Sequence, residues 1–336
     1  MTPFETPAKK KLMPILPPVA APAGLSTAEV SAIAGQIIAS VETVIVGKHE
    51  AVTLAVAVWL AEGHFLIEDV PGVAKTMLAR AMAQSAGCTF KRIQCTPDLQ
   101  PSDVLGGPYL DPQSGRTEFR FGPIFSQFVL VDEINRASPR TQAAMLEAMG
   151  EAMVTEGIVS YRLQKPFMIV ATQNPIEQEG TFLLPEAQKD RFLMRLNLGY
   201  PSLADEKQMV ERFQLRHPID TLQPVATPDR ILKCQEAVRR VNVPPAVCDY
   251  VLKIVRATRE HPALLLGSSP RGSLGLFRAA QAVAAIGGED TVSAALVKAL
   301  AGKVLAHRLT VRREDKWRNT NVEEVVAEIL QQTPPP

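Results

Sequence analysis

The fold is decided by a stretch of chain that joins a short apolar run to the start of a helix: Phe65-Leu66-Ile67-Glu68-Asp69-Val70-Pro71-Gly72-Val73-Ala74-Lys75-Thr76. The run from His64 to Asp69 predicts a buried strand, and the residues from Lys75 to about Ala86 predict a helix. Where a strand enters a tight turn and Lys-Thr opens a helix, backbone N–H groups face phosphates, the lysine reaches the β- and γ-phosphates, and the threonine hydroxyl binds Mg²⁺. The expected phosphate loop comprises Pro71, Gly72, Val73, Ala74, Lys75 and Thr76.

The match to the general phosphate-loop pattern is incomplete. Of G-x-x-x-x-G-K-[ST], the chain meets only the last two positions, because Asp69 and Ala74 stand where the glycines are expected. Taken alone, the stretch fits a phosphate-binding loop or an ordinary turn equally well.

A second apolar run ends in two acids. Phe128 to Val131 predicts a strand, and Asp132 and Glu133 follow it directly. Near bound phosphates, the first acid can hold Mg²⁺ and the second can polarise an attacking water. A strand with a solvated acidic end is the alternative. The position after Lys75, with one expected strand (Phe90 to Gln94) between, favours the nucleotide interpretation.

Two further polar positions fit the same chemistry. The expected strand Phe167 to Ala171 leads to Asn174, whose amide can contact the γ-phosphate or the water. Arg191 precedes another apolar run, and a guanidinium there suits transition-state charge on a phosphoryl group, often from a neighbouring subunit. The alternative is a surface salt bridge of Arg191 with Asp190 or Glu186.

Strand and helix signals divide the chain unevenly. Short strands alternating with helices predict a parallel sheet, and after Tyr200-Pro201 only helical segments are expected. We therefore expect a proline-rich tail over residues 1–25, an α/β domain over 26–201, a helical domain over 202–331 and a tail over 332–336.

Helix starts carry capping signals. Ser26 with Glu29 forms an expected capping box, and Ser269 with Pro270 begins another expected helix. Arg271 then lies in a first turn, where a cation is unfavourable for the helix dipole. This position suggests a ligand-facing arginine, with an ordinary surface arginine as the alternative.

Composition limits the function classes. The chain has 336 residues and a net charge of +1, which argues against a protein that coats polyanions. Its four widely spaced cysteines favour reduced thiols and a cytoplasmic location over zinc binding or a disulfide framework. The longest apolar stretch, Ala51 to Ala61, is too short to span a membrane. Prolines interrupt the N-terminal run that imitates a secretion signal.

Taken in order, these elements resemble the MoxR family of AAA+ ATPases. The similarity extends from about Val44 to Arg308 and includes EDVPGVAKT, TPDLQPSDVLG, LVDEINRASPRTQAAMLEAM, ATQNPIEQEGTFLLPEAQKDRF and SSPRG. The resemblance implies a P-loop NTPase sheet flanked by helices and followed by an all-helical lid.

The resemblance also implies residue roles. Lys75 and Thr76 correspond to the Walker A pair, and Asp132 and Glu133 to the Walker B acids, so that Thr76 and Asp132 would hold Mg²⁺. The remaining correspondences are Asn174 to sensor 1, Arg191 to the arginine finger acting in trans with Lys189 as a second choice, Arg271 to sensor 2, and Val44 and Gly47 to adenine contacts.

Two insertions are similar to those of the family. Residues 103–123 resemble its helix-2 insert, and Val154 to Leu163, with Gly157 at the turn, resembles its pre-sensor-1 hairpin. In such rings both project toward the central pore or one face.

The function implied is hydrolysis of ATP with Mg²⁺ in a ring-shaped homo-oligomer, expected to be a hexamer. That hydrolysis would drive chaperone-like remodelling or activation of client proteins, with von Willebrand factor A domain proteins as expected clients. A motor acting on nucleic acid is a second hypothesis, disfavoured by the charge balance and by a hairpin with only Arg162 and Lys165. A nucleotide-gated scaffold with little turnover is a third, and Glu133, Asn174 and Arg191 argue against it.

Overall fold

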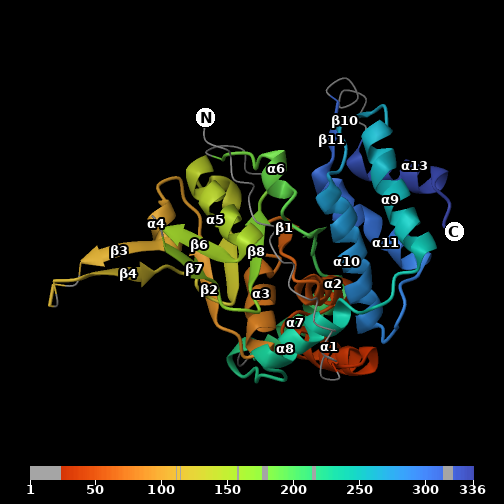
Figure 1. Ribbon diagram of the computed structural model, residues 1–336. Helices are drawn as coiled ribbons and strands as arrows, with labels where there is room; N and C mark the ends of the chain where they lie inside the picture. Colours follow the sequence, from red (N-terminus) through yellow and green to blue (C-terminus); the bar gives the residue numbers. More distant parts are fainter. Residues whose placement is uncertain are drawn as a thin grey trace, which may run out of the picture.

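A parallel sheet of five short strands forms the centre of the α/β part of the chain (Figure 1). The computed structural model describes residues 24–110, 112–113, 115–156, 159–175, 181–213, 217–312 and 321–336. The strand order is β2-β5-β8-β1-β9, and all neighbouring pairs are parallel, as the alternation of strands and helices predicts. The strands are β1 (Phe65–Glu68), β2 (Phe90–Gln94), β5 (Phe128–Asp132), β8 (Met168–Gln173) and β9 (Met194–Leu196).

Helices cover both faces of this sheet, because successive strand residues point to opposite sides. Phe65 and Ile67 join one apolar core, and Leu66 joins the other. The first core includes α1 (Thr27–Glu42), α2 (His49–Leu60) and α3 (Lys75–Ser85), and the second includes α5 (Pro139–Glu151). All residues of β5 are buried, so Asp132 is carried to the edge of the sheet by a rigid strand.

Side-chain caps fix where several helices begin. Ser26 and Glu29 make the predicted capping box at α1, with the Ser26 Oγ accepting from the Glu29 N–H. Ser269 Oγ accepts from the Arg271 N–H at the start of α10 (Pro270–Ile286), so the predicted cap and the first-turn position of Arg271 are both confirmed.

The lid is built mainly of helices, and α10 packs against α1 and α2. Its described part also contains a short antiparallel pair, β10 (Leu264–Leu266) with β11 (Thr310–Val311), which the sequence analysis does not anticipate. The remaining elements here are η2 (Pro218–Asp220), α8 (Pro228–Val238), α9 (Pro245–Glu260), α11 (Ala294–Leu305), η3 (Ala306–Arg308) and α13 (Val322–Gln332).

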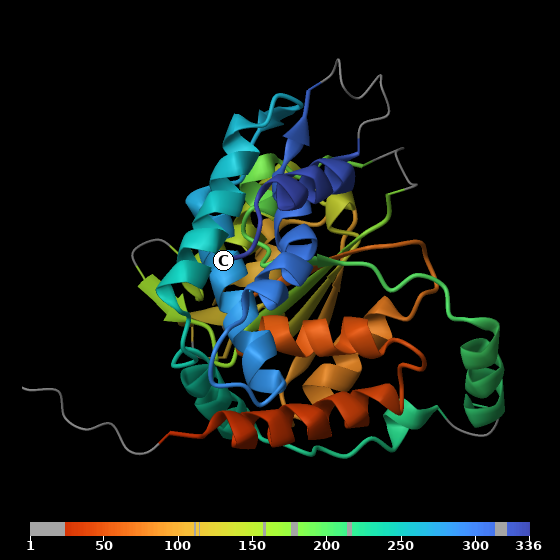
Figure 2. The same cartoon turned by 90° about the vertical axis from the view of Figure 1, so that its right-hand side faces the viewer.

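One helix stands apart from the rest. In α7 (Leu203–Phe213) no residue is buried, and Leu203 is 86% exposed. Figure 2 shows this helix beside the main body of the molecule. In the sequence, it lies between the last strand of the sheet and the helices of the lid.

The two insertions form neighbouring hairpins. After α4 (Pro101–Leu105), β3 (Gly106–Leu110) and β4 (Thr117–Phe121) extend far from the sheet (Figure 1). β6 (Met153–Glu156) and β7 (Val159–Arg162) form the second hairpin, whose expected turn residue Gly157 lies outside the described residues. Phe119 stacks on Tyr161 with ring centroids 4.3 Å apart, which joins the two hairpins.

The remaining expectations concern the termini and the cysteines. Residues 1–23 lie outside the described residues, so the tail stays a prediction. All four cysteines are free thiols. Among the described residues, no helix has both the length and the apolar character needed to cross a membrane. The domain boundaries near residues 26, 202 and 331 also stay predictions.

Candidate functional site

The loop between β1 and α3 has the backbone of a phosphate cradle. Gly72 has a φ of 87°, and no atom lies within 4 Å of the position that a Cβ would take there. Ala74 has a φ of 62°, so alanine adopts the left-handed conformation that glycine enters more easily. The N-cap residue of α3, Ala74, makes no side-chain capping bond, and the N-terminus of a helix favours an anion. The departure from the glycine pattern at Ala74 therefore changes the residue but not the shape.

Asp69, the other departure from the pattern, has a structural role. Its Oδ2 accepts hydrogen bonds from the backbone N–H groups of Leu198 and Gly199, each at 2.6 Å. Its Oδ1 accepts from the Val70 N–H at 2.9 Å, and its backbone carbonyl accepts from Lys75 Nζ at 2.7 Å. A glycine could supply only the last of these bonds.

Glu133 and Asn174, two of the predicted catalytic residues, meet the expected phosphate loop in one cavity of about 350 Å³ at the carboxyl ends of the strands. This is the edge of a parallel sheet where ligands usually bind. Of the predicted residues, the cavity is lined by Pro71, Gly72, Ala74, Lys75, Thr76, Asp132, Glu133 and Asn174.

The two acids at the end of β5 have different surroundings. Asp132 is 8% exposed and its Oδ1 accepts from Thr172 Oγ1 at 2.5 Å. Glu133 takes a left-handed φ of 55°, and its Oε2 accepts from Gln94 Nε2 and Arg136 Nη1, both at 3.0 Å. Asp132 is therefore fixed within the sheet, whereas Glu133 projects from its edge.

Sequence reasoning missed two residues of β2 whose side chains contact the two acids. Arg92 lines the cavity and donates to Asp132, and Gln94 donates to Glu133. The signal was present, since polar residues two positions apart on a strand lie on one face. In the parallel register Gln94 lies beside Asp132, which brings both side chains to the acids.

Arg191 and Arg271 line a different cavity, of about 280 Å³, between the sheet domain and α10. Arg191 Nη1 donates to the Leu146 carbonyl at 2.8 Å, while the neighbouring Asp190 makes the ionic contacts. Asp190 accepts from Ser269 Oγ at 2.8 Å and from Arg308 Nη1 at 3.0 Å, and Arg271 Nη1 lies 3.9 Å from it. The Asp190 carboxylate thus joins the turn that carries Arg191 to the start of α10.

Arg308 is the buried cation of this group. Burial lowers its pKa to about 10, and the adjacent Asp190 opposes that shift. Lys189, the second choice for a trans cation, pairs instead with Glu186 at 3.1 Å, three residues earlier on α6 (Glu186–Lys189).

The predicted adenine contacts do not line the cavity at Lys75. Val44 is 3% exposed and packs in the apolar core. Val73 of the expected phosphate loop is also buried in this core and does not line the cavity. Gly47 has a φ of 71°, and the Asp205 carboxylate occupies the space that a Cβ would take. The adenine assignment therefore stays a prediction.

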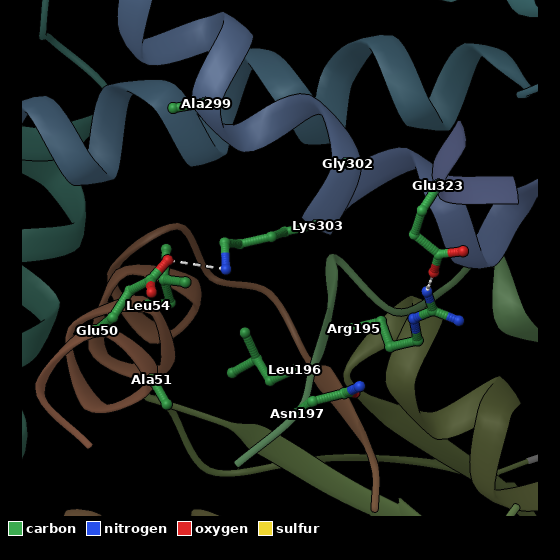
Figure 3. Close-up of a pocket in the computed structure, with 10 residues that line it drawn as sticks. All are labelled: Glu50, Ala51, Leu54, Arg195, Leu196, Asn197, Ala299, Gly302, Lys303 and Glu323. Atoms are coloured by element: carbon green, nitrogen blue, oxygen red, sulfur yellow. Dashed lines mark hydrogen bonds and ion pairs between the residues drawn. The ribbon is translucent and has the colours of Figure 1, made fainter. Parts of the chain in front are cut away.

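A third cavity, of about 410 Å³, lies where the edge strand meets the lid, and charged side chains surround it (Figure 3). Lys303 of α11 pairs with Glu50 of α2 at 2.8 Å. Arg195 of β9 pairs with Glu68 at 3.1 Å and also with Glu323 of α13. The pairs Lys303–Glu50 and Arg195–Glu323 each join a lid helix to the α/β part of the chain. We therefore interpret this cavity as part of the contact between sheet and lid.

The residues that line the cavity at Lys75 fit Mg²⁺ and a nucleoside triphosphate. The N-terminus of α3 and the Lys75 side chain suit phosphate oxygens. Thr76 and Asp132 supply the hydroxyl and carboxylate oxygens that Mg²⁺ prefers, with water completing its shell.

The family comparisons agree with this geometry. Residues 64–194 match the ATPase family associated with various cellular activities (AAA), and residues 256–329 match the AAA lid domain. YeaC of Bacillus subtilis (strain 168) is 45% identical over 88% of this chain and 92% of its own. Chaperone MoxR1 of Mycobacterium tuberculosis is 40% identical over 87% of this chain and 79% of its own.

The fold comparison leads to the same group. A solved structure from Cytophaga hutchinsonii has a TM-score of 0.86 and 33% identity, covering 92% of this chain and 96% of that one. Protein MoxR of Paracoccus denitrificans is 31% identical over 81% of this chain and 86% of its own length. With the phosphate loop, the acids and the lid in their expected places, the chain belongs to the MoxR family of AAA+ ATPases.

Proposed function

We propose that this protein hydrolyses ATP with Mg²⁺ in a ring-shaped oligomer, a hexamer, and uses the resulting movement to remodel client proteins. The observation that carries the proposal is the division of the catalytic groups between two cavities. Lys75, Asp132 and Glu133 line one, whereas Arg191 and Arg271 line another. A catalytic site that needs both sets is completed when the arginines of one subunit meet the phosphate loop of the next.

Each residue has a distinct task in this reaction. Lys75 and the N–H groups of the loop bind the phosphates, and Mg²⁺, when bound at Thr76 and Asp132, neutralises phosphate charge. Glu133 accepts a proton from the attacking water, and Asn174 orients that water. Arg191 and Arg271 of the neighbouring subunit stabilise the charge that develops on the transferred phosphoryl group.

Subunit mixing tests the division directly. Lys75→Ala should bind no nucleotide and Arg191→Ala should bind but not hydrolyse it, so each alone is inactive. In mixed rings, some interfaces pair an intact phosphate loop with an intact arginine, and part of the ATPase activity should return. Arg162→Ala, an exposed arginine on β7, serves as the control that leaves activity unchanged. Absence of any rescue in rings shown to exchange subunits would assign Arg191 to its own subunit.

Chaperone-like action rests on the family and on the two joined hairpins. Exposed apolar side chains on them, such as Phe121 at 58% and Leu110 at 62%, suit contact with a client protein. Proteins with von Willebrand factor A domains are the proposed clients. A Glu133→Gln variant with ATP should capture such a domain in a pull-down, and the same variant without ATP is the control. Capture that is equal with and without ATP would argue against nucleotide-driven remodelling.

A further inference from the structure

The guanidinium of Arg92 is bound to the carboxylate expected to hold Mg²⁺. Arg92 Nη2 and Nε donate to Asp132 Oδ2 at 2.6 and 3.1 Å. The other oxygen of Asp132 accepts from Thr172 Oγ1 at 2.5 Å. Protein donors therefore contact both oxygens of this carboxylate.

The two partners differ in their freedom to move. The Asp132 side chain is 11% exposed and ends a fully buried strand, whereas the Arg92 side chain is 49% exposed on the edge strand β2. A carboxylate removed from water needs a counter-charge, and Arg92 supplies one. Asp132 is thus a fixed group, and Arg92 is a counter-ion with room to leave it.

We propose that Arg92 keeps Mg²⁺ off Asp132 until nucleotide arrives. A guanidinium in hydrogen-bond contact with Oδ2 repels a divalent cation at that oxygen, because like charges at short range interact strongly in a half-buried site. A triphosphate is a competing anion whose oxygens suit the planar donors of arginine. Nucleotide in the same cavity therefore draws Arg92 away and opens Asp132, so metal and nucleotide load together.

This inference rests on the proposed function, since it takes Asp132 as the metal ligand. It also explains why an arginine lines a cavity that already contains Lys75. Gln94 Oε1 accepts from Arg92 Nη2 at 2.5 Å, which holds the guanidinium in its blocking position. Arg92 acts through Asp132 and is a positioning residue.

Titration of nucleotide-free protein with Mn²⁺ as a paramagnetic probe for Mg²⁺ tests the proposal. Arg92→Gln should bind Mn²⁺ at least about tenfold more tightly than the wild type, a difference of ~1.4 kcal/mol. The matched control is Lys91→Gln, which removes the same charge from the next position of the strand and should behave as wild type. A double variant, Arg92→Gln with Asp132→Asn, should lose the gained site.

Three results would overturn the proposal. They are equal Mn²⁺ affinity in wild type and Arg92→Gln, an equal gain in Lys91→Gln, and a gain that survives in the double variant. Mn²⁺ should also raise the melting temperature of Arg92→Gln and leave that of the wild type unchanged. If Arg92→Gln does not fold, Arg92→Lys is the substitute, and its single ammonium should give an intermediate affinity.

The experiment separates this inference from the proposed function, because it uses no nucleotide. If the protein binds and hydrolyses ATP while Arg92→Gln has wild-type Mn²⁺ affinity, only the role of Arg92 fails. If Arg92→Gln gains an Asp132-dependent Mn²⁺ site while the protein does not hydrolyse ATP, only the proposed function fails.

Discussion

The Asp69 carboxylate bonds to the backbone N–H of Leu198 at 2.6 Å, which ties the phosphate loop to the chain that leaves the sheet toward α7. The same residue holds the Lys75 ammonium through its backbone carbonyl at 2.7 Å. If nucleotide draws Lys75 to its phosphates, as proposed, it acts on the residue that also fixes the exit from β9. Asp69 links the cavity at Lys75 to the connection between sheet and lid.

Asp69→Asn should weaken both folding and nucleotide binding. Each carboxylate oxygen accepts backbone N–H groups, and an asparagine must turn its own NH₂ toward one set of them. We expect a loss of about 2–3 kcal/mol of unfolding free energy, measured by denaturant titration, and weaker binding of a fluorescent ATP analogue. Glu68→Gln is the neighbouring control, because its carboxylate contacts Arg195 instead. Wild-type stability of Asp69→Asn would show that the bonds from Leu198 and Gly199 to the Asp69 carboxylate do not stabilise the fold.

Asp190→Asn should destabilise the fold and abolish ATPase activity. It removes the partner of Arg308, whose side chain is 3% exposed, and breaking such a buried pair costs about 3–5 kcal/mol. Glu186→Gln, which breaks the half-exposed pair with Lys189, should cost under about 1 kcal/mol. Thermal melting compares the two. Equal small losses would show that Asp190 does not organise the arginine cavity.

Glu133→Gln should bind ATP normally and hydrolyse it at least about a hundredfold more slowly, since the amide cannot take a proton from water. Calorimetry measures the binding, and phosphate release measures the turnover. Glu147→Gln changes an exposed acid of α5 and should leave both values unchanged. Hydrolysis by Glu133→Gln at the wild-type rate would refute the assignment of the water-activating base.

His64 should make the protein less stable in mild acid. Burial lowers its pKa from an ordinary 6.5 to about 4, and its Nδ1 accepts from the Ile169 N–H, so a proton there would face a donor. The unfolded chain binds that proton between these two pH values and the folded chain does not. Stability is therefore complete above pH 6.5 and falls as the pH drops toward 4, by up to about 3 kcal/mol.

Denaturant titrations at pH 7 and pH 4.5 measure this effect. His64→Gln should show a smaller difference between the two pH values. Some pH dependence should remain, because His307 is also buried with its pKa lowered, chiefly by the same loss of water contact. An unchanged difference in His64→Gln would exclude His64 as the source.

The sequence alone determined the order of most elements and most of the residues that line the cavity at Lys75. Lys75, Thr76, Asp132 and Glu133 were predictable because each lies at or beside the start of a helix or the end of a strand, whose period and turn residues are local signals. The capping residues Ser26 and Ser269 were predictable for the same reason. The backbone at a strand end or a helix start sets the positions of the neighbouring side chains, and this local geometry does not depend on contacts with distant residues.

Only the tertiary structure decided the contacts between residues distant in the sequence. Asp69 meets Leu198, Arg92 meets Asp132, and Asp190 meets Arg308 because sheet order and lid packing bring them together. Those arrangements depend on how apolar faces of separate elements are buried against one another, and no local pattern records that outcome. The same packing places Arg191 and Arg271 in a different cavity from Lys75.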